Sequence, residues 1–256
     1  MAQESIVGTR PMPHPRPVVL ITGAARRLGA AIARRLHAAG YDLALHYRQS
    51  AADMQALAAE LEAVRTGSVI SFQADLADFD RLPDLVAQTM SRYGRLDALV
   101  NNASSYYPTP IGEATAAHWD DLFASNARAP FFLSQAAAPH LKAARGAIVN
   151  LADIYADRPL QSHTVYCMAK AALVMMTKSL AVELGPDVRV NAIAPGNVLW
   201  SDDQPDAETK DIVESRTTLH RQGTPEDIAQ AVENCLASPY LTGQIIAIDG
   251  GRSLFI

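Results

Sequence analysis

Residues 18–29 read VVLITGAARRLG and join a short apolar strand to a turn that opens a helix. The run VVLIT (18–22) is typical of a buried strand, and helical spacing of apolar residues follows from Leu28 to Gly40. Gly23 and Gly29 flank the turn, so backbone N–H groups and the helix N-terminus can face a pyrophosphate. The alternative is an ordinary strand-to-helix turn that binds no phosphate, and the motifs further along the chain argue against it.

Strands and helices alternate beyond this stretch. Apolar runs predict strands at 42–47, 68–73, 96–103, 147–152, 188–196 and 244–248, and helical periodicity predicts helices at 51–65, 80–93, 116–143 and 162–184. Continuous apolar strands separated by helices indicate a parallel sheet that is covered on both faces. We therefore expect an α/β fold: a single-domain, Rossmann-type, doubly wound parallel sheet of about seven strands, with its ligand at the carboxyl ends of the strands.

The two irregular parts of the chain are its start and the segment 197–224. Residues 1–16 hold three prolines and no periodicity, which predicts a mobile N-terminal tail before a single domain over 17–256. The segment 197–224 is polar with a short helical pattern inside it. In this fold plan such an insertion predicts a substrate lid, with a solvated surface loop as the alternative.

The composition is that of a globular protein with a substantial core: 256 residues, 49% hydrophobic, 19% charged and a net charge of −5. The acidic balance argues against a nucleic-acid partner. No apolar run suggests a membrane span, and the N-terminus does not resemble a signal peptide. Two distant cysteines, Cys167 and Cys235, fit a reducing cytoplasm and offer no metal site.

The end of the second predicted strand, HYRQS (46–50), indicates which nicotinamide cofactor is used. NAD sites place a carboxylate here for the ribose 2′-hydroxyl, and this stretch has none. Arg48 and Ser50 instead offer a cation and a hydroxyl for a 2′-phosphate, with help from Arg26 or Arg27. NADPH is therefore the expected cofactor; the alternative is that Arg48 points to solvent.

The strongest chemical signal is the pair Tyr166 and Lys170, which lie four residues apart on a predicted helix and share a face. An ammonium group beside a phenol is expected to lower the pKa of the phenol, and the lysine can also hold the nicotinamide ribose. Cys167, between them, is better explained as a core residue, and His163 as structural.

Three further positions fit the same site. Asp75 follows the third strand and is placed to accept a hydrogen bond from an adenine amino group. NNAS (101–104) ends the fourth strand beside the cofactor, and Asn126 lies in the long helix, where it can hold a kink or a water. Each of these alone is equally compatible with a helix cap or a turn.

With these motifs together, the chain resembles the short-chain dehydrogenase/reductase family from about residue 17 to 252, including IDGG (248–251). Within that family it resembles the pteridine reductases through TGAARRLG (22–29), HYRQSAA (46–52) and NNASSYYPTP (101–110). Arg27 replaces the middle glycine of the family turn. Asp153, thirteen residues before Tyr166, stands where most of the family has a serine.

The resemblance implies a role for each of these departures. Reduction of a pterin C=N bond needs a proton on nitrogen as well as a hydride on carbon, and a carboxyl group such as Asp153 can donate it. Tyr106 would stack on the pterin ring, while Arg27 and Ser104 would form hydrogen bonds to the polar edge of the pterin. Tyr107, Leu199 and Trp200 would line the wall, although Trp200 also suits ordinary packing under the lid.

The motifs and the resemblance together imply the following catalytic, cofactor-binding and substrate-binding residues. The catalytic residues are Asp153, Tyr166 and Lys170. The cofactor residues are Gly23, Arg27, Leu28, Gly29, Tyr47, Arg48, Ser50, Asp75, Leu76, Asn102, Ala103, Ser104, Asn126, Tyr166, Lys170, Pro195 and Gly196. The substrate residues are Arg27, Ser104, Tyr106, Asp153, Tyr166 and Trp200, and no metal is expected.

The expected function is NADPH-dependent reduction of pterins, from dihydropterin to tetrahydropterin, with dihydrofolate and oxidised biopterin as further candidate substrates. A carbonyl or enoyl-thioester reductase of the same family is the nearest alternative. A catalytically silent NADP(H) sensor is disfavoured because it would need none of Asp153, Tyr166 and Lys170. The resemblance also implies a homotetramer, and the cysteine usage described above favours a cytoplasmic location.

Overall fold

The computed structural model describes residues 16–198, 211–212 and 214–255, so the expectations for the N-terminal tail, for Leu199 and Trp200 and for much of the lid fall outside it. A seven-stranded sheet in the order β3-β2-β1-β4-β5-β6-β7 forms its centre, and every neighbouring pair of strands is parallel. The strands are β1 (Val18–Ile21), β2 (Asp42–Tyr47), β3 (Val69–Gln73), β4 (Ala98–Asn101), β5 (Ala147–Leu151), β6 (Arg189–Pro195) and β7 (Ile245–Ile248). The predicted Rossmann-type fold is confirmed.

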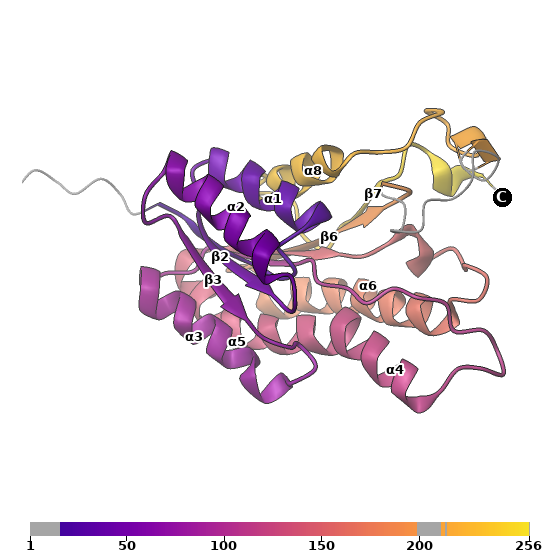
Figure 1. Cartoon of the computed structure of the whole chain (residues 1–256), viewed down its shortest axis with the longest axis horizontal. Coiled ribbons are helices and arrows are strands. Elements are labelled where there is room, and N and C mark those ends of the chain that lie inside the picture. The colour runs from indigo at the N-terminus through magenta and orange to yellow at the C-terminus, as the bar shows by residue number, and fades with distance from the viewer. Residues whose placement is uncertain (1–15, 199–210, 213, 256) are drawn as a thin grey trace, which may run out of the picture.

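Helices cover both faces of the sheet (Figure 1). One face carries α1 (Arg27–Ala38), α2 (Ala51–Val64) and α8 (Pro225–Ala237), and the other carries α3 (Leu82–Tyr93), α4 (Ala116–Phe123), α5 (Ala129–Ala144) and α6 (Thr164–Leu184). Side chains of β1 alternate between the two cores: Val19 and Ile21 pack on the α1 side, and Leu20 on the α3 side. Burial on both faces explains why the strands are continuous apolar runs.

Two elements differ from the expected helices. The predicted helix over 116–143 is interrupted by a π-helical turn, η2 (Ala124–Arg128), between α4 and α5. Helix α8 is absent from the expectations, although the Thr224 side chain accepts a hydrogen bond from the N–H of Asp227 and the Asp227 side chain accepts one from the N–H of Thr224, which is a capping box. Pro225 at the first helical position is a second start signal.

The order of strands reverses at β1, which lies between β2 and β4. Parallel neighbours end at the same edge, so the loops after β1, β2 and β3 meet there with those after β4, β5 and β6. A crevice at such a reversal is the usual ligand site of this fold.

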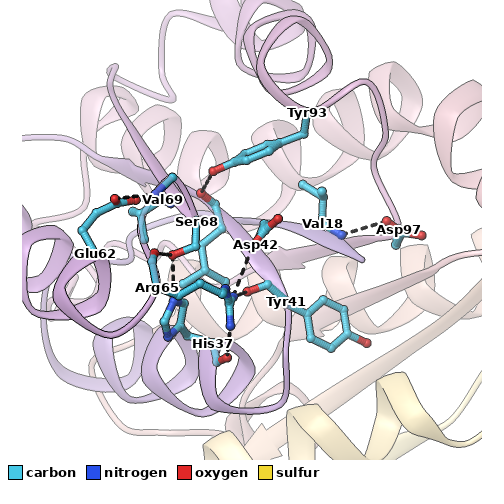
Figure 2. Close-up of polar contacts among 12 residues, drawn as sticks. Val18, His37, Tyr41, Asp42, Glu62, Arg65, Ser68, Val69, Tyr93 and Asp97 are labelled. Carbon is cyan, nitrogen blue, oxygen red and sulfur yellow. Dashed lines mark hydrogen bonds and ion pairs between the residues drawn. The ribbon is translucent and has the colours of Figure 1, made fainter. Parts of the chain in front are cut away.

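The opposite, amino edge of the sheet is closed by polar contacts (Figure 2). Arg65, just after α2, forms an ion pair with Asp42 (Nη2–Oδ1, 3.2 Å) and donates hydrogen bonds to the carbonyls of His37 and Tyr41. The buried ring of His37 contacts Ser68 (Nε2–Oγ, 2.8 Å). This cluster ties α1, α2 and the starts of β2 and β3 together.

Helix α6 bears on the expectation that the chain has no membrane span. Among the described residues it is the one helix that is long and apolar enough to cross a membrane by length and composition. It packs in the core instead: Leu173, Thr177 and Leu180 are buried, and the helix lies against the sheet beside α5. One face of α6 therefore belongs to the core, while Met175 and Val182 on the same helix are exposed.

Candidate active site

A cavity of about 650 Å³ opens at the carboxyl edge of the sheet. It is lined by every predicted cofactor residue except Asn126, and by Arg27, Ser104, Tyr106, Asp153 and Tyr166 from the predicted substrate set. Residues from seven separate stretches of sequence thus meet in one place. Trp200 lies outside the described residues.

The turn after β1 is held by its neighbours. Gly23 has a φ of +62°, a conformation that favours glycine, and an added Cβ would lie 2.9 Å from Ala103 Cα. Its carbonyl accepts a hydrogen bond from Asn102 Nδ2 (3.0 Å), and the hydroxyl of Thr22 accepts from the backbone N–H groups of Asn102 and Ala103. The loop after β4 therefore fixes the turn after β1.

Arg27 occupies the middle-glycine position of this turn and has a φ of +53°. The left-handed conformation explains why glycine suits the position, since other residues adopt it at a cost. Its side chain lines the cavity from the start of α1.

The cationic end of the cavity lies after β2. Arg48 and Ser50 line the cavity together with Arg26 and Arg27, so its lining includes three arginines from the turn after β1 and the loop after β2. Asp53 pairs with Arg26 (3.8 Å) on the surface of α2, and the cavity lining does not include it. The donor set therefore fits an anionic group at the position of a ribose 2′-substituent.

The proposed catalytic residues come from two adjacent elements. Asp153 follows β5, and Tyr166 and Lys170 lie one turn apart on α6. The hydroxyl of Tyr166 donates a hydrogen bond to Asp153 Oδ2 (2.7 Å), and Asp153 Oδ1 accepts another from the N–H of Tyr155 (2.9 Å). Lys170 Nζ donates to the carbonyl of Leu151 (2.7 Å) and lies 5.7 Å from the centre of the Tyr166 ring.

Burial governs the protonation of these three groups. It raises the pKa of Asp153, against the opposing effects of the Tyr155 and Tyr166 hydrogen bonds and of Lys170. It also lowers the pKa of Lys170 to about 8, although the Asp153 charge opposes this. The expected lowering of the Tyr166 pKa is wrong here, because burial and the adjacent Asp153 raise it well above its usual value.

The loop after β4 carries the predicted substrate wall. Tyr106 is 52% exposed, stacks on His163 (ring centres 4.9 Å apart, 17° between planes) and meets Tyr166 edge to face at 4.9 Å. Tyr107 is not in the cavity lining; its hydroxyl donates to Asp121 Oδ2 (2.9 Å) and fastens the loop to α4. Tyr107 is thus a support for the wall and not part of it.

Asn126 supports the same loop through hydrogen bonds to Ser104 and Ser105. It is buried in the π-helical turn, where its Oδ1 accepts from the Ser104 hydroxyl (2.7 Å) and its Nδ2 donates to the carbonyls of Ser105 and Leu122 (both 2.9 Å). The turn presents this side chain to the loop while Leu122 still packs in the core.

The cavity includes residues that the sequence analysis did not select. His46, Asp121, Ser125, Tyr155 and Arg252 all line it. His46 and Tyr155 are close in sequence to predicted residues, namely Tyr47 and Asp153, and that proximity was an available signal. No sequence feature marks Arg252, which reaches the cavity from the turn after β7.

Comparison with known proteins agrees with this geometry. Residues 23–253 match the family model described as Enoyl-(Acyl carrier protein) reductase. The chain is 40% identical to Pteridine reductase 1 of Leishmania tarentolae, with 93% of this chain and 96% of the relative covered. It is 34% identical to Granaticin polyketide synthase putative ketoacyl reductase 2 of Streptomyces violaceoruber, over 93% of this chain and 96% of that protein.

A third relative is a 3-oxoacyl-(acyl-carrier-protein) reductase of Staphylococcus aureus (strain Mu50 / ATCC 700699), which is 35% identical over 91% of this chain and 96% of its own length. The relatives thus span several activities on one scaffold. With its sheet order, its glycine turn and its Tyr166–Lys170 pair, the chain belongs to the short-chain dehydrogenase/reductase family of NAD(P)(H)-dependent oxidoreductases.

Proposed function

We propose that this enzyme reduces pterins with NADPH, converting a dihydropterin to its tetrahydro form. The observation that carries the proposal is the contact of a partly buried carboxyl, Asp153, with the hydroxyl of Tyr166 at 2.7 Å. The similarity to Pteridine reductase 1 of Leishmania tarentolae supports it.

The carboxyl group suits reduction of a C=N bond. Bound NADPH supplies the hydride; the chain's own groups must supply the proton on the neighbouring nitrogen. Burial raises the pKa of Asp153, which favours its neutral, proton-donating form. Tyr166 keeps its proton because its pKa is raised, and its hydroxyl donates a hydrogen bond to Asp153. The pair can thus hold a transferable proton beside the reacting atoms.

The wall of the cavity suits a flat heterocycle. Tyr106 lies half exposed beside Tyr166, with its orientation held by stacking on His163. An aromatic ring in this position can cover one face of a planar substrate. Arg27 and Ser104 line the same cavity, where a guanidinium group can donate hydrogen bonds to polar ring edges and the Ser104 hydroxyl oxygen can accept one.

The proposed preference for NADPH rests on charge. Arg26, Arg27 and Arg48 all line the cavity, and the stretch 46–50 contributes no carboxylate to that lining. Charge-assisted hydrogen bonds to a 2′-phosphate are stronger than neutral bonds to a hydroxyl.

A carbonyl or enoyl-thioester reductase is the second candidate. The ketoacyl and 3-oxoacyl reductases among the relatives, and the name of the family model, favour it. Asp153, which stands where most of the family has a serine, and the half-exposed ring of Tyr106 beside Tyr166 favour the pterin over this alternative.

One substrate panel separates these candidates. NADPH oxidation is measured with dihydrobiopterin, dihydrofolate, a simple ketone and a 3-oxoacyl thioester. Turnover of the pterin with little ketone or thioester reduction is expected. Efficient thioester or ketone reduction with no pterin turnover would instead assign the enzyme to the second candidate.

We also propose that the enzyme is a cytoplasmic homotetramer. Met168, Met175 and Val182 recur every seven residues on α6 and are 45%, 61% and 84% exposed, so they form an apolar stripe. Exposed apolar stripes of this kind commonly pack against a second copy. Light scattering on the wild type and on Met175→Glu should report a tetramer and a smaller species, and a monomeric wild type would contradict the proposal.

A further inference from the structure

His46 lies at the end of β2 and is 1% exposed. Its Nδ1 is 3.2 Å from the backbone nitrogen of Gly23, and its Nε2 is 3.0 Å from the carbonyl oxygen of Ala74. A backbone N–H can only donate and a carbonyl can only accept. The ring must therefore be neutral, with its proton on Nε2.

These two hydrogen bonds join three loops of the cofactor site. Gly23 begins the glycine turn after β1, and Ala74 immediately precedes Asp75 after β3; Gly23 and Asp75 both line the cavity. His46 itself leads into Tyr47 and Arg48 at the end of β2. The carbonyl of Gly23 accepts a hydrogen bond from Asn102, and the backbone N–H of Gly23 donates to the imidazole of His46, so both backbone polar groups of Gly23 are held.

A second proton on this ring would set two donors against each other. Nδ1–H would face the N–H of Gly23, so one of them would have to move. Burial lowers the pKa of His46, while the Ala74 bond and the charge of Asp75, which is the ionisable group acting on the ring, partly oppose this. Acidification is thus expected to disturb the glycine turn.

We propose that His46 is a positioning residue for the cofactor: its neutral imidazole holds the glycine turn and the loop after β3 in register, and protonation releases them and weakens NADP(H) binding. If only the neutral form binds, the apparent dissociation constant rises by about tenfold per pH unit below the pKa of His46 in the free enzyme. This inference does not depend on the identity of the substrate.

Two variants separate the two hydrogen bonds. In His46→Asn, the side-chain oxygen can take the place of Nδ1 and accept from Gly23, and no titrating group remains. In His46→Gln, the amide nitrogen can take the place of Nε2 and donate to Ala74, and the Gly23 bond is lost. His37→Asn is the matched control, since His37 is also buried but lies at the opposite edge of the sheet.

The experiment is equilibrium binding of NADPH and NADH, followed by nicotinamide fluorescence from pH 8 to 5, with circular dichroism at each pH to verify folding. NADH is included because the 2′-phosphate of NADPH itself titrates near pH 6. Wild type and His37→Asn should bind both cofactors more weakly as the pH falls. His46→Asn should lose this pH dependence, and His46→Gln should bind ~10-fold more weakly already at pH 7.5.

The proposal fails if wild-type affinity for NADH does not change with acidification, if His46→Asn keeps the wild-type pH dependence, or if Asn and Gln weaken binding equally. Nitrogen-15 NMR of the histidine rings of the wild type gives a test that needs no variant. It should show His46 neutral with its proton on Nε2 at pH 6.5, and an Nδ1–H ring would overturn the argument.

Discussion

Replacement of Asp153 by Asn tests the proposed chemistry most directly. The carboxyl uses Oδ1 to accept from the N–H of Tyr155 (2.9 Å) and Oδ2 to accept from the Tyr166 hydroxyl (2.7 Å). An asparagine oxygen can keep the first bond, which caps the 3₁₀ turn Ile154–Ala156, while the amide cannot transfer a proton. The variant therefore removes the acid and retains the cap.

The expected loss follows from the role of a positioned general acid. We expect pterin turnover to fall by ~10²–10⁴, which corresponds to ~3–5 kcal/mol of transition-state stabilisation. NADPH affinity, measured by fluorescence, should stay within a few-fold of wild type. Asp153→Ser, which creates the arrangement common in the wider family, should not restore pterin turnover.

The stability of the variant gives a second measurement with a defined sign. The pKa of Asp153 is raised in the folded state, so the folded protein binds more protons than the unfolded chain between pH 3.8 and that raised value. Wild-type stability should therefore fall as the pH rises through this window, because a partly buried carboxyl becomes ionised. Asp153→Asn lacks this slope and should be at least as stable as wild type at pH 7 in urea unfolding.

Two outcomes would refute the reasoning. Wild-type pterin turnover in Asp153→Asn would show that the carboxyl donates no essential proton. A large loss of stability with a proportionate loss of activity would indicate that Asp153 acts only as a cap.

Three further changes test the cofactor end and the buried lysine. Arg48→Ala should raise the NADPH Michaelis constant ~10–100-fold by removing a charge-assisted phosphate contact; an equal rise for NADH would contradict a phosphate role. Arg27→Gly should raise the free energy of unfolding by about 1 kcal/mol, because it relieves a left-handed φ of +53°. It should also weaken substrate and cofactor binding, so unchanged binding would show that Arg27 points away from the ligands. Lys170→Met should abolish turnover yet stabilise the protein at pH 7 by about 3 kcal/mol, since burial lowers the lysine pKa from 10.5 to about 8. Between pH 8 and 10.5 the unfolded wild-type chain binds more protons than the folded protein, so the stability of the wild type rises with pH. The stability advantage of the variant should therefore shrink over this range. A difference in the free energy of unfolding that stays constant with pH, measured in urea, would show that Lys170 is not desolvated.

Local pattern was enough to predict much of the fold. The strand at 42–47 has the predicted bounds, since its apolar run begins and ends abruptly. The break inside 116–143 was not predictable, because a π-helical turn leaves helical periodicity almost unchanged. Helix α8 could have been predicted from the capping box at Thr224.

For the candidate site, too, some features depend on local sequence and others depend on tertiary packing. The sequence by itself determined that Tyr166 and Lys170 share one helical face, because that relation depends on local geometry alone. It also determined that the loops carrying Gly23, Arg48 and Asp153 gather at one edge of the sheet, because parallel strands in a doubly wound fold all end there.

Only the tertiary structure decided how these groups behave. Tyr107 could not be separated from the substrate wall without seeing its bond to Asp121 on another element. The raised pKa of Tyr166 depends on which atoms exclude water from the phenol and on its contact with Asp153, thirteen residues away. His46 links three loops that no sequence spacing connects. Desolvation and hydrogen bonding between distant segments are properties of the packed chain, and so they appear only when the fold is complete.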